Sequence, residues 1–408
     1  MGRGQRAAVR HGRLTRVGGF GRFVRSVLTV VVVCAVAGVS LVSIAAWRLT
    51  DKLETSSVDI GNGRTEAVPS IGAMSGAFTV LLVGEDNSAG QTGFGAARQA
   101  TLNDVNILVH VAADHRSATV VSLPRDLVID QPQCTDPTTK QVYPAVSAEP
   151  LNTAISRGGL GCVVATVEQQ TGMSIPYAAL FSFEGTVAMA DAVGGVQVCA
   201  TKAIDDPDSG LKLKAGVSTI SGRTALAYLR DRHGVGDGSD LGRIGSQQAY
   251  MSSLLRKMTS SSTLSDPTRL YALADAAAND VVLSKSLASV DTMVTMMLAL
   301  KQIPLSQIAF VQYPVATDPD DSAKVVPDTA LATELLTRVK AGKPIVLDKS
   351  NLGVSAVLAK SKSASTGTGT KSAGTSSSTK SSSKSASTIP GLKGQTAAEQ
   401  TCSVAFDS

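Results

Sequence analysis

The chain has 408 residues and a mass of 41.8 kDa, with 43% hydrophobic residues, 4% aromatic residues and a formal net charge of +5. Its positive mean hydropathy of +0.14 excludes a wholly disordered chain, and its single long apolar run excludes a protein with many membrane spans. The length allows one or two globular domains of ordinary size.

The positive charge lies at the two ends of the chain. Residues 1–25 contain seven arginines and no acidic residue, and the residues from 351 onward carry a net charge of +4. The middle, residues 26–350, carries a net charge of −6. A nucleic-acid-binding protein needs a basic face on its folded domain, so we expect no nucleic-acid partner.

Residues 26–47, after this basic leader, form an uncharged apolar stretch. About 20 such residues in a helix cross a hydrocarbon core of roughly 30 Å, which predicts a transmembrane helix. The arginines of 1–25 place the leader in the cytoplasm, so we expect a single-pass cell-membrane protein whose main domain is extracellular. The alternative is a cleaved signal peptide, which the length of the stretch and the lack of an obvious cleavage site disfavour.

Residues 48–75 form a polar juxtamembrane linker, and we place the extracellular domain at 76–347. Short runs rich in β-branched residues predict buried strands over 78–83, 104–111 and 117–122. Apolar residues at helical spacing predict helices over 151–171, 221–233, 239–258 and 267–301. This mixture indicates an α/β or α+β sandwich in which helices cover a central sheet. Met293, Met296 and Met297 either belong to the core, which we favour, or line a lipid-accepting cleft.

Four of the five cysteines lie on the expected outer side of the membrane. An even number in that position suits an oxidising compartment, and four cysteines allow three disulfide pairings. We favour Cys134 with Cys162 and Cys199 with Cys402, because the first two bracket one segment; the sequence alone leaves the pairing open. The chain has no CxxC motif, which excludes a zinc ribbon and a thioredoxin-type site.

Residues 348–408 form a Ser/Thr/Lys-rich tail with a terminal cysteine segment. From about 355 to 388 the composition is almost entirely Ser, Thr, Ala, Gly and Lys, which cannot bury enough apolar surface to offset chain entropy. We therefore expect disorder there. The composition beyond it is mixed again, and a disulfide at Cys402 would make the tail a tethered loop.

The residues suited to chemistry are aspartates and arginines near strand ends and in the late helices. The chain lacks HExxH, GxSxG and Walker motifs. Two carboxylates can hold one Mg²⁺, and several guanidinium groups can grip a diphosphate. Taken singly, the same residues have ordinary interpretations as turn residues or surface ion pairs. They are Asp86, Asp104, Arg125, Asp126, Arg230, Arg232, Asp240, Arg243 and Gln247.

An ordered series of motifs over about 78–258 resembles the LytR-CpsA-Psr family of bacterial cell-wall ligases, in its actinobacterial type. The motifs are LLVGED, DVNILVHV, SLPRDL, LNTAISRGG, DAVGGVQV, AGVSTISGRTALAYLRDR and GDGSDLGRIGSQQ. The resemblance implies an α/β/α sandwich with a central mixed sheet and a hydrophobic cavity for a polyprenyl chain. It also implies Mg²⁺-dependent transfer of a glycopolymer from a polyprenyl-pyrophosphate carrier to peptidoglycan, typically onto the C6 hydroxyl of N-acetylmuramic acid.

The resemblance assigns roles to individual residues. Asp86 and Asp104 would be the Mg²⁺ ligands. Asp126 is the candidate base for the acceptor hydroxyl, with orientation of Arg125 as its alternative role. The residues that would grip the pyrophosphate are Arg125, Arg230, Arg232 and Arg243, with Gln247 beside them, and those assigned to catalysis are Arg125, Asp126 and Arg243.

The chain departs from the family pattern at three positions where the pattern has arginine: Ser88, Leu102 and Ser246. Losing a charge-assisted contact to a developing phosphate charge typically costs about 10²–10³ in rate. The resemblance makes a phosphotransferase, with a pyrophosphatase side activity, the leading hypothesis, whereas the three absent arginines favour its alternative. The alternative is a non-catalytic polyprenyl-pyrophosphate-binding or scaffolding protein of wall assembly. The sequence does not identify the glycopolymer.

Overall fold

The computed structural model of this chain describes residues 19–61, 74–86, 101–260, 266–348, 351–353, 355–359 and 388–406. The chain divides into two compact units, residues 1–51 and 52–408. Helix α1 covers Gly19–Ser56, with only the backbone described for residues 19–22 and 34–46. Across the described residues, no helix combines the length and the apolar character needed to cross a membrane. Most of the basic leader and part of the predicted linker, residues 62–73, lie outside the described residues.

A seven-stranded mixed sheet forms the centre of the second unit, in the order β13-β8-β1-β2-β3-β14-β18. Strand β2 pairs antiparallel with both β1 and β3, whereas β8 is parallel to β1 and β14 is parallel to β3. The three strands predicted from the sequence are the middle of this sheet. The strand bounds are β1 Phe78–Asp86, β2 Leu102–Val111, β3 Ala118–Leu123, β8 Tyr177–Phe181, β13 Val281–Leu283, β14 Ile308–Gln312 and β18 Gly394–Thr396.

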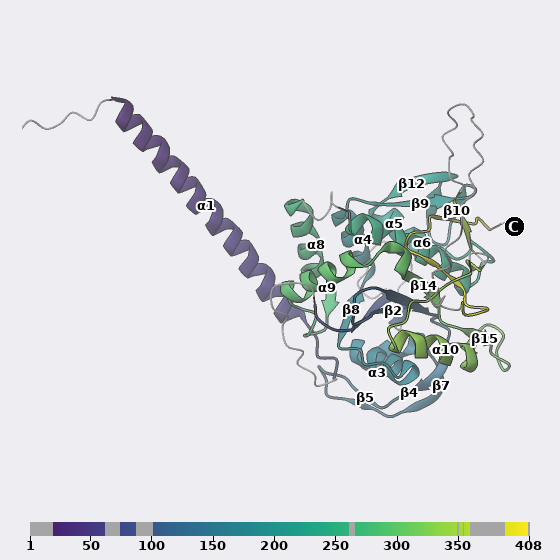
Figure 1. Ribbon diagram of the computed structural model, residues 1–408. Helices are drawn as coiled ribbons and strands as arrows, with labels where there is room; N and C mark the ends of the chain where they lie inside the picture. Colours follow the sequence, from purple (N-terminus) through teal and green to yellow (C-terminus); the bar gives the residue numbers. More distant parts are fainter. Residues whose placement is uncertain are drawn as a thin grey trace, which may run out of the picture. The chain divides into compact units, whose positions relative to one another are not determined.

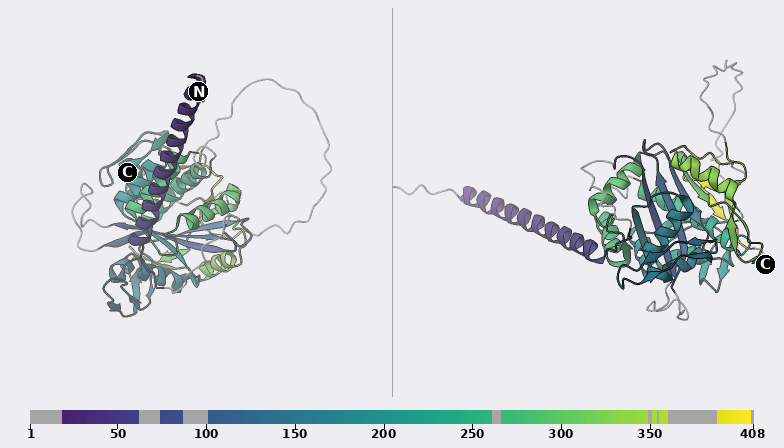
Figure 2. Two further views of the ribbon diagram at one scale, coloured as in Figure 1. Left: turned by 90° about the vertical axis from the view of Figure 1, so that its left-hand side faces the viewer. Right: turned by 90° about the horizontal axis from the view of Figure 1, so that it is seen from below.

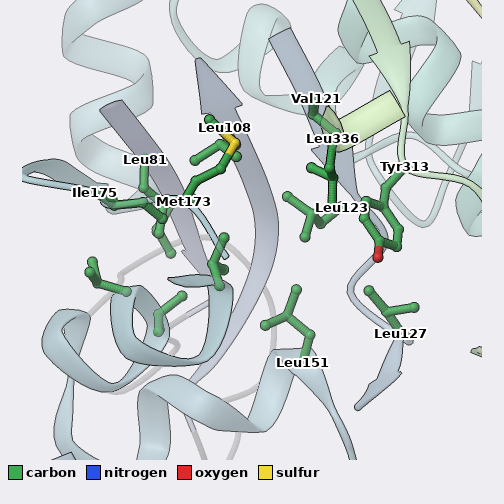
Figure 3. Packing of buried hydrophobic residues seen from close by; sticks show 14 of the residues in the cluster. Leu81, Leu108, Val121, Leu123, Leu127, Leu151, Met173, Ile175, Tyr313 and Leu336 are labelled. Atoms are coloured by element: carbon green, nitrogen blue, oxygen red, sulfur yellow. The ribbon is translucent and has the colours of Figure 1, made fainter. Parts of the chain in front are cut away.

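Helices cover both faces of this sheet (Figures 1 and 2), as in an α/β/α sandwich. On one face lie α2 (Ala154–Gly158), α3 (Leu160–Thr171) and α10 (Thr329–Lys340). On the other face lie α4 (Phe183–Ala192), α5 (Gly222–Arg230) and α6 (Asp240–Met258). Apolar side chains of β1, β2 and β3 meet those of α3 and α10 in the main core (Figure 3), where Leu81, Leu108 and Val121 are fully buried. Burial of this apolar surface is the main force that holds the layers together.

A smaller sheet, in the order β12-β9-β19-β17, packs against α6 and shares a core with α5. Its core includes Val196, Tyr228 and Tyr250, all buried. Next to it lies the hairpin of β10 (Ile204–Asp206) and β11 (Leu211–Leu213). The strand bounds of the smaller sheet are β9 Val196–Ala200, β12 Gly216–Ile220, β17 Ala356–Leu358 and β19 Thr401–Ser403.

The remaining elements lie at the periphery. Two small antiparallel pairs, β4–β7 and β5–β6, follow β3 in the chain, and a third, β15–β16, follows β14. Their bounds, with those of the remaining helices, are β4 Val128–Gln131, β5 Cys134–Thr135, β6 Val142–Tyr143, β7 Val146–Pro150, β15 Val315–Thr317, β16 Val325–Pro327, η1 Leu151–Thr153, η2 Leu305–Gln307, α8 Pro267–Asp280 and α9 Val290–Gln302.

Two predicted helices are interrupted in the structure. The helix predicted over 151–171 forms three pieces, η1, α2 and α3, and Gly159, with a positive φ of 72°, separates α2 from α3. The helix predicted over 267–301 is wrong at its centre: the run Val281–Leu283 leaves the helix and pairs antiparallel with β8 at the edge of the central sheet. Such a run of apolar, β-branched residues suits a strand once a sheet edge is available. Met296 in α9 is buried, as expected for a core residue.

The end of the chain belongs to the folded unit, so the domain boundary expected at 347 is too early. Strand β18 completes the central sheet against β14, and β19 joins the smaller sheet. Residues 360–387, the bulk of the segment expected to be disordered, lie outside the described residues. Both favoured disulfides are confirmed: Cys134 is bonded to Cys162, and Cys199 to Cys402.

Candidate functional site

The two predicted metal ligands lie at neighbouring ends of β1 and β2. Asp86 is the last residue of β1, is buried, and pairs in register with Leu102. The register shifts between Gly84 and Glu85, so that Asp104 is an extra residue in β2. Such a bulge re-aims a side chain at a sheet edge. Asp86 and Asp104 therefore come from adjacent strands at one end of the sheet.

Arg125 follows β3 and extends its side chain across to β2. Its Nη1 donates to both carboxylate oxygens of Asp104, at 3.0 and 2.9 Å. Its Nε donates to Asp126 Oδ2 at 3.3 Å and lies 3.7 Å from Asp240 Oδ1. Pro124 lacks a backbone N–H and helps to end the strand there. One guanidinium group thus contacts three carboxylates.

The first turn of α6 supplies the other half of the site. Ser239 caps this helix, with its Oγ accepting the Gly242 N–H at 3.2 Å. Asp240 and Arg243 are three residues apart and so share a face of the helix, where Arg243 Nη2 lies 2.5 Å from Asp240 Oδ1. Arg243 also reaches β2, donating to the Asp104 carbonyl oxygen at 2.9 Å.

We call Asp104, Arg125, Asp126, Asp240 and Arg243 the arginine–aspartate cluster. Its side chains are 5% to 25% exposed. Burial raises the pKa of the Asp126 carboxyl, and the charge of Arg125 partly opposes this. Burial lowers the pKa of the nearby Arg232, with the positive charge of Arg125 adding to the effect. The low dielectric of such a site strengthens any contact made by these charges.

The cluster and the nearby Arg232 contain buried donors and acceptors that the described residues leave unsatisfied. The Nε groups of Arg243 and Arg232 are buried without a hydrogen-bond acceptor in the described part of the chain. Asp240 Oδ2 is buried without a donor among the same residues. Unsatisfied guanidinium N–H groups suit the oxygens of a phosphate or diphosphate. Spare carboxylate oxygens, here Asp240 Oδ2, suit a hard cation, so the donor chemistry of the cluster is compatible with the Mg²⁺ expected from the sequence.

Two predicted site residues lie against other neighbours. The guanidinium of Arg230 lies over the ring of Phe183, 4.4 Å from its centroid. Gln247 is buried, and its Nε2 donates to the Leu229 carbonyl at 3.0 Å, which ties α6 to the end of α5. The described contacts therefore place Arg125, Arg232 and Arg243 near one another and give Arg230 and Gln247 separate partners.

The three positions at which the family pattern has arginine lie in different parts of the structure or outside its described residues. Ser246 is fully buried, and its Oγ lies 3.1 Å from Ser403 Oγ in β19. Leu102 is half-buried in β2, opposite Asp86. Ser88 lies outside the described residues. At position 246, the C-terminal segment thus occupies the space beside α6.

Sequence reasoning underestimated two contributors to the site. Asp240 has no role in the family-based assignment, although its spacing of three residues from Arg243 indicates that the two side chains share a helix face. The C-terminal segment braces α6: Ser355 Oγ donates to the Gly242 carbonyl at 2.5 Å, and Arg256 Nη1 donates to the Ala397 carbonyl at 2.6 Å. The return to mixed composition near Cys402 was its only signal in the sequence.

A surface hollow opens near the end of β1, on the side of α2. Its lining includes Glu85, Ile155, Arg157 and Leu180 and is therefore mixed rather than apolar. Burial raises the pKa of Glu85. Neighbouring residues of a strand point to opposite faces of the sheet, so Glu85 and Asp86 face different sides. The hydrophobic lipid-accepting cavity remains a prediction.

The arginine–aspartate cluster lies in a part of the chain that matches a known protein family. A model of the LytR_cpsA_psr family matches residues 45–341, well over half of the chain. The chain belongs to the LytR-CpsA-Psr family. The sequence-based family prediction is thereby confirmed, and every member of the arginine–aspartate cluster lies within the matched residues.

Several similar proteins have names that refer to bacterial cell-wall synthesis. The chain is 32% identical over 260 residues to the cell wall biosynthesis protein LcpA of Corynebacterium glutamicum, covering 58% of this chain and 50% of LcpA. It is 26% identical over 193 residues to TagT of Bacillus subtilis, a polyisoprenyl-teichoic acid–peptidoglycan teichoic acid transferase, covering 46% of this chain and 54% of TagT. The chain spans about half the length of the curated relatives it matches.

Solved structures share the fold. A LytR-Csp2A-Psr enzyme from Actinomyces oris matches with a TM-score of 0.51 and 22% identity, over 69% of this chain and 94% of that one. TagT bound to LIIa-WTA matches with a TM-score of 0.51 and 20% identity, over 70% of this chain and 98% of that one. The mixed α/β fold built on a central mixed sheet is therefore the fold of these proteins.

Proposed function

We propose that this chain is a cell-wall phosphotransferase. It moves a glycopolymer from a polyprenyl-pyrophosphate carrier onto peptidoglycan, at the C6 hydroxyl of N-acetylmuramic acid, with a pyrophosphatase side activity when water replaces that acceptor. Family membership and the names of the similar transferases support the class of reaction. The observation that carries the proposal is the pair of buried guanidinium Nε groups, of Arg232 and Arg243, without acceptors among the described residues.

The proposed transfer forms one phosphorus–oxygen bond and breaks another. The acceptor hydroxyl oxygen forms a bond to the phosphorus that carries the glycopolymer, and the bond from that phosphorus to the bridging oxygen breaks. Polyprenyl phosphate leaves with the electron pair, and the hydroxyl proton passes to a carboxylate. Asp126 is the proposed acceptor of that proton, because its raised pKa brings a carboxylate closer to the range useful to a general base.

The arginines bind and orient the diphosphate in this proposal. Arg243 and Arg125 are held by Asp104, Asp240 and Asp126, so their planar donors are positioned before substrate arrives. Asp86 and Asp104 would hold Mg²⁺, which supplies neutralisation of the diphosphate charge when bound. Asp104 would then be shared between the cation and Arg125.

The proposed site of action is the outer face of the cell membrane. Both disulfides support an oxidising compartment, since such bonds persist outside the cytosol. The substrates in this proposal, a polyprenyl-linked glycan and peptidoglycan, occur on that side of the membrane. The single span over 26–47 and the cytoplasmic leader remain part of the proposal.

A direct assay tests this function. Full-length protein in detergent is given a polyprenyl-pyrophosphate-linked glycan and peptidoglycan with Mg²⁺, and both polyprenyl phosphate and wall-linked glycan are measured. Arg243→Lys keeps the charge but loses the planar fork, so we expect about a 10²–10³-fold loss of rate. Arg338→Lys, on α10 and paired with the exposed Glu334, is the matched control and retains the rate. Equal rates for the two variants would refute the site assignment.

The same assay also tests the second candidate function, that of a non-catalytic protein that binds the carrier lipid. Burial of Ser246 beneath Ser403, where the family pattern has arginine, favours this second candidate, because the position offers no guanidinium group to the diphosphate. Binding of the carrier lipid without release of polyprenyl phosphate would select it.

A further inference from the structure

A second group of potential metal ligands lies outside the arginine–aspartate cluster. Asp206 and Asp208 are at the turn of the hairpin β10–β11, and His233 is in the segment that follows α5. Each offers a ligand atom, and these atoms all lie within 4.8 Å of one another. His233 Nδ1 is 2.8 Å from Asp208 Oδ2. In the parts of the chain that the structure describes, this is the one group of three such residues that could surround an ion.

A buried carboxylate lies behind this group. Asp231 is fully buried, and its Oδ1 accepts the Gly234 N–H at 2.9 Å. Its Oδ2 has no hydrogen-bond donor among the described residues. This carboxylate lies within hydrogen-bonding reach of the Asp206 carboxylate. Two adjoining carboxylates repel each other unless a shared proton or a cation lies between them, so a bound cation is one way to remove that penalty.

Gly234, three residues after Asp231, leaves room for the buried carboxylate. A Cβ at Gly234 would come within 2.8 Å of Asp231 Oδ2 and 2.6 Å of Ile204 Cγ2. Any larger residue at this position would force the Ile204 or Asp231 side chain to shift. The chain is therefore built closely around the buried carboxylate.

We propose that Asp206, Asp208 and His233 bind a divalent transition-metal ion, with the buried Asp231 carboxylate beside it. One imidazole nitrogen together with carboxylate oxygens suits Zn²⁺ or Mn²⁺ better than Mg²⁺ or Ca²⁺, which prefer oxygen ligands alone. The side chains of Asp208 and His233 are 70% and 62% exposed, so an ion can enter from solvent. A bound ion would tie the hairpin to the segment after α5.

Zinc binding to the full-length protein tests this proposal. Protein without a histidine tag is stripped with a chelator and titrated with ZnCl₂ by calorimetry, and the bound metal is counted by elemental analysis. We expect one equivalent of Zn²⁺ per chain. Asp208→Asn and His233→Gln each weaken binding by at least about 10-fold. Because both side chains are largely exposed, these variants keep the fold, which circular dichroism checks.

Two matched variants locate the ion. Asp205→Asn removes a neighbouring carboxylate that pairs with Lys212 at 3.0 Å, and it leaves zinc affinity unchanged. Asp86→Asn alters the proposed Mg²⁺ site and also leaves zinc affinity unchanged. Absence of zinc binding, or equal affinity in wild type, Asp208→Asn and His233→Gln, would overturn the proposal. Displacement of Zn²⁺ by equimolar Mg²⁺ would overturn the assignment to a transition metal.

Discussion

The arginine–aspartate cluster and the hairpin group differ in how their charges are paired. In the first, the guanidinium groups of Arg125 and Arg243 contact carboxylates from β2, the β3 end and α6. In the second, the carboxylates of Asp206 and Asp231 adjoin, with His233 as the nearby ionisable base. In the arginine–aspartate cluster the carboxylates are therefore paired with guanidinium groups, and spare N–H donors remain for an anion. The hairpin group instead has a spare carboxylate oxygen for a cation.

The difference shows why counting charged residues is a poor guide to function. Both groups lie in the net-acidic middle of the chain, and they come close in sequence, since His233 of the second precedes Asp240 of the first by seven residues. Partner geometry decides which kind of ligand each attracts. An already paired guanidinium can still donate from its Nε, but a carboxylate facing another carboxylate favours a positive ion.

The largest expected loss of stability comes from removing a positively charged side chain from the arginine–aspartate cluster. Arg243→Ala leaves Asp240 and Asp104 less compensated in a buried site, so we expect the free energy of unfolding to fall by about 3–5 kcal/mol. Urea unfolding followed by circular dichroism measures it. Arg338→Ala breaks a partly exposed pair with Glu334 and should cost no more than about 1 kcal/mol. Similar losses in the two variants would show that the first cluster is not electrostatically distinct.

A smaller loss is expected from releasing the C-terminal segment, which contacts both regions. Strand β19 meets α6 through Ser403 and Ser246, and the Phe406 N–H donates to the Gly234 carbonyl at 2.9 Å. Replacing Cys199 and Cys402 together by Ser removes a bond between residues 203 apart in sequence, and we expect a loss of about 2–4 kcal/mol.

The other disulfide provides the comparison for that double variant. Replacing Cys134 and Cys162 by Ser removes a bond across a sequence separation of only 28, which constrains the unfolded chain less. We expect a smaller loss in urea unfolding, with zinc affinity of the hairpin group unchanged. A weaker zinc affinity in this variant would show that loosening the fold far from the hairpin group is enough to disturb it.

The smallest expected effect is a difference between wild type and Asp126→Asn in how the free energy of unfolding depends on pH. Folding raises the pKa of Asp126 above its ordinary value, chiefly by burial, so the folded state holds this proton more tightly than the unfolded state. The stability that this proton contributes is present at low pH and is lost as the pH rises through the folded pKa. Between pH 4 and pH 7, wild type should therefore lose more stability, or gain less, than Asp126→Asn. Parallel urea-unfolding profiles would contradict the burial of this carboxyl.

Local patterns identified much of the fold from the sequence. The β-branched runs of β1, β2 and β3 and the helical spacing of α6 are properties of short segments, and the motif series pointed to the correct family. The helix expected over 267–301 failed at Val281–Leu283, because pairing with β8 outweighs the local helical pattern there. The end of the chain was placed outside the domain, since two three-residue strands carry almost no local signal.

The sequence by itself determined which groups are available: the aspartates and arginines of the cluster, the four bridging cysteines and the residues that mark the family. Only the tertiary structure decided which of them meet. Arg243 reaches Asp104 across 139 residues of sequence, and Asp206 adjoins Asp231 only because the hairpin packs beside the segment after α5. Residue type fixes charge and donor chemistry locally, whereas contact between distant side chains depends on sheet register, bulges and packing that no short segment specifies.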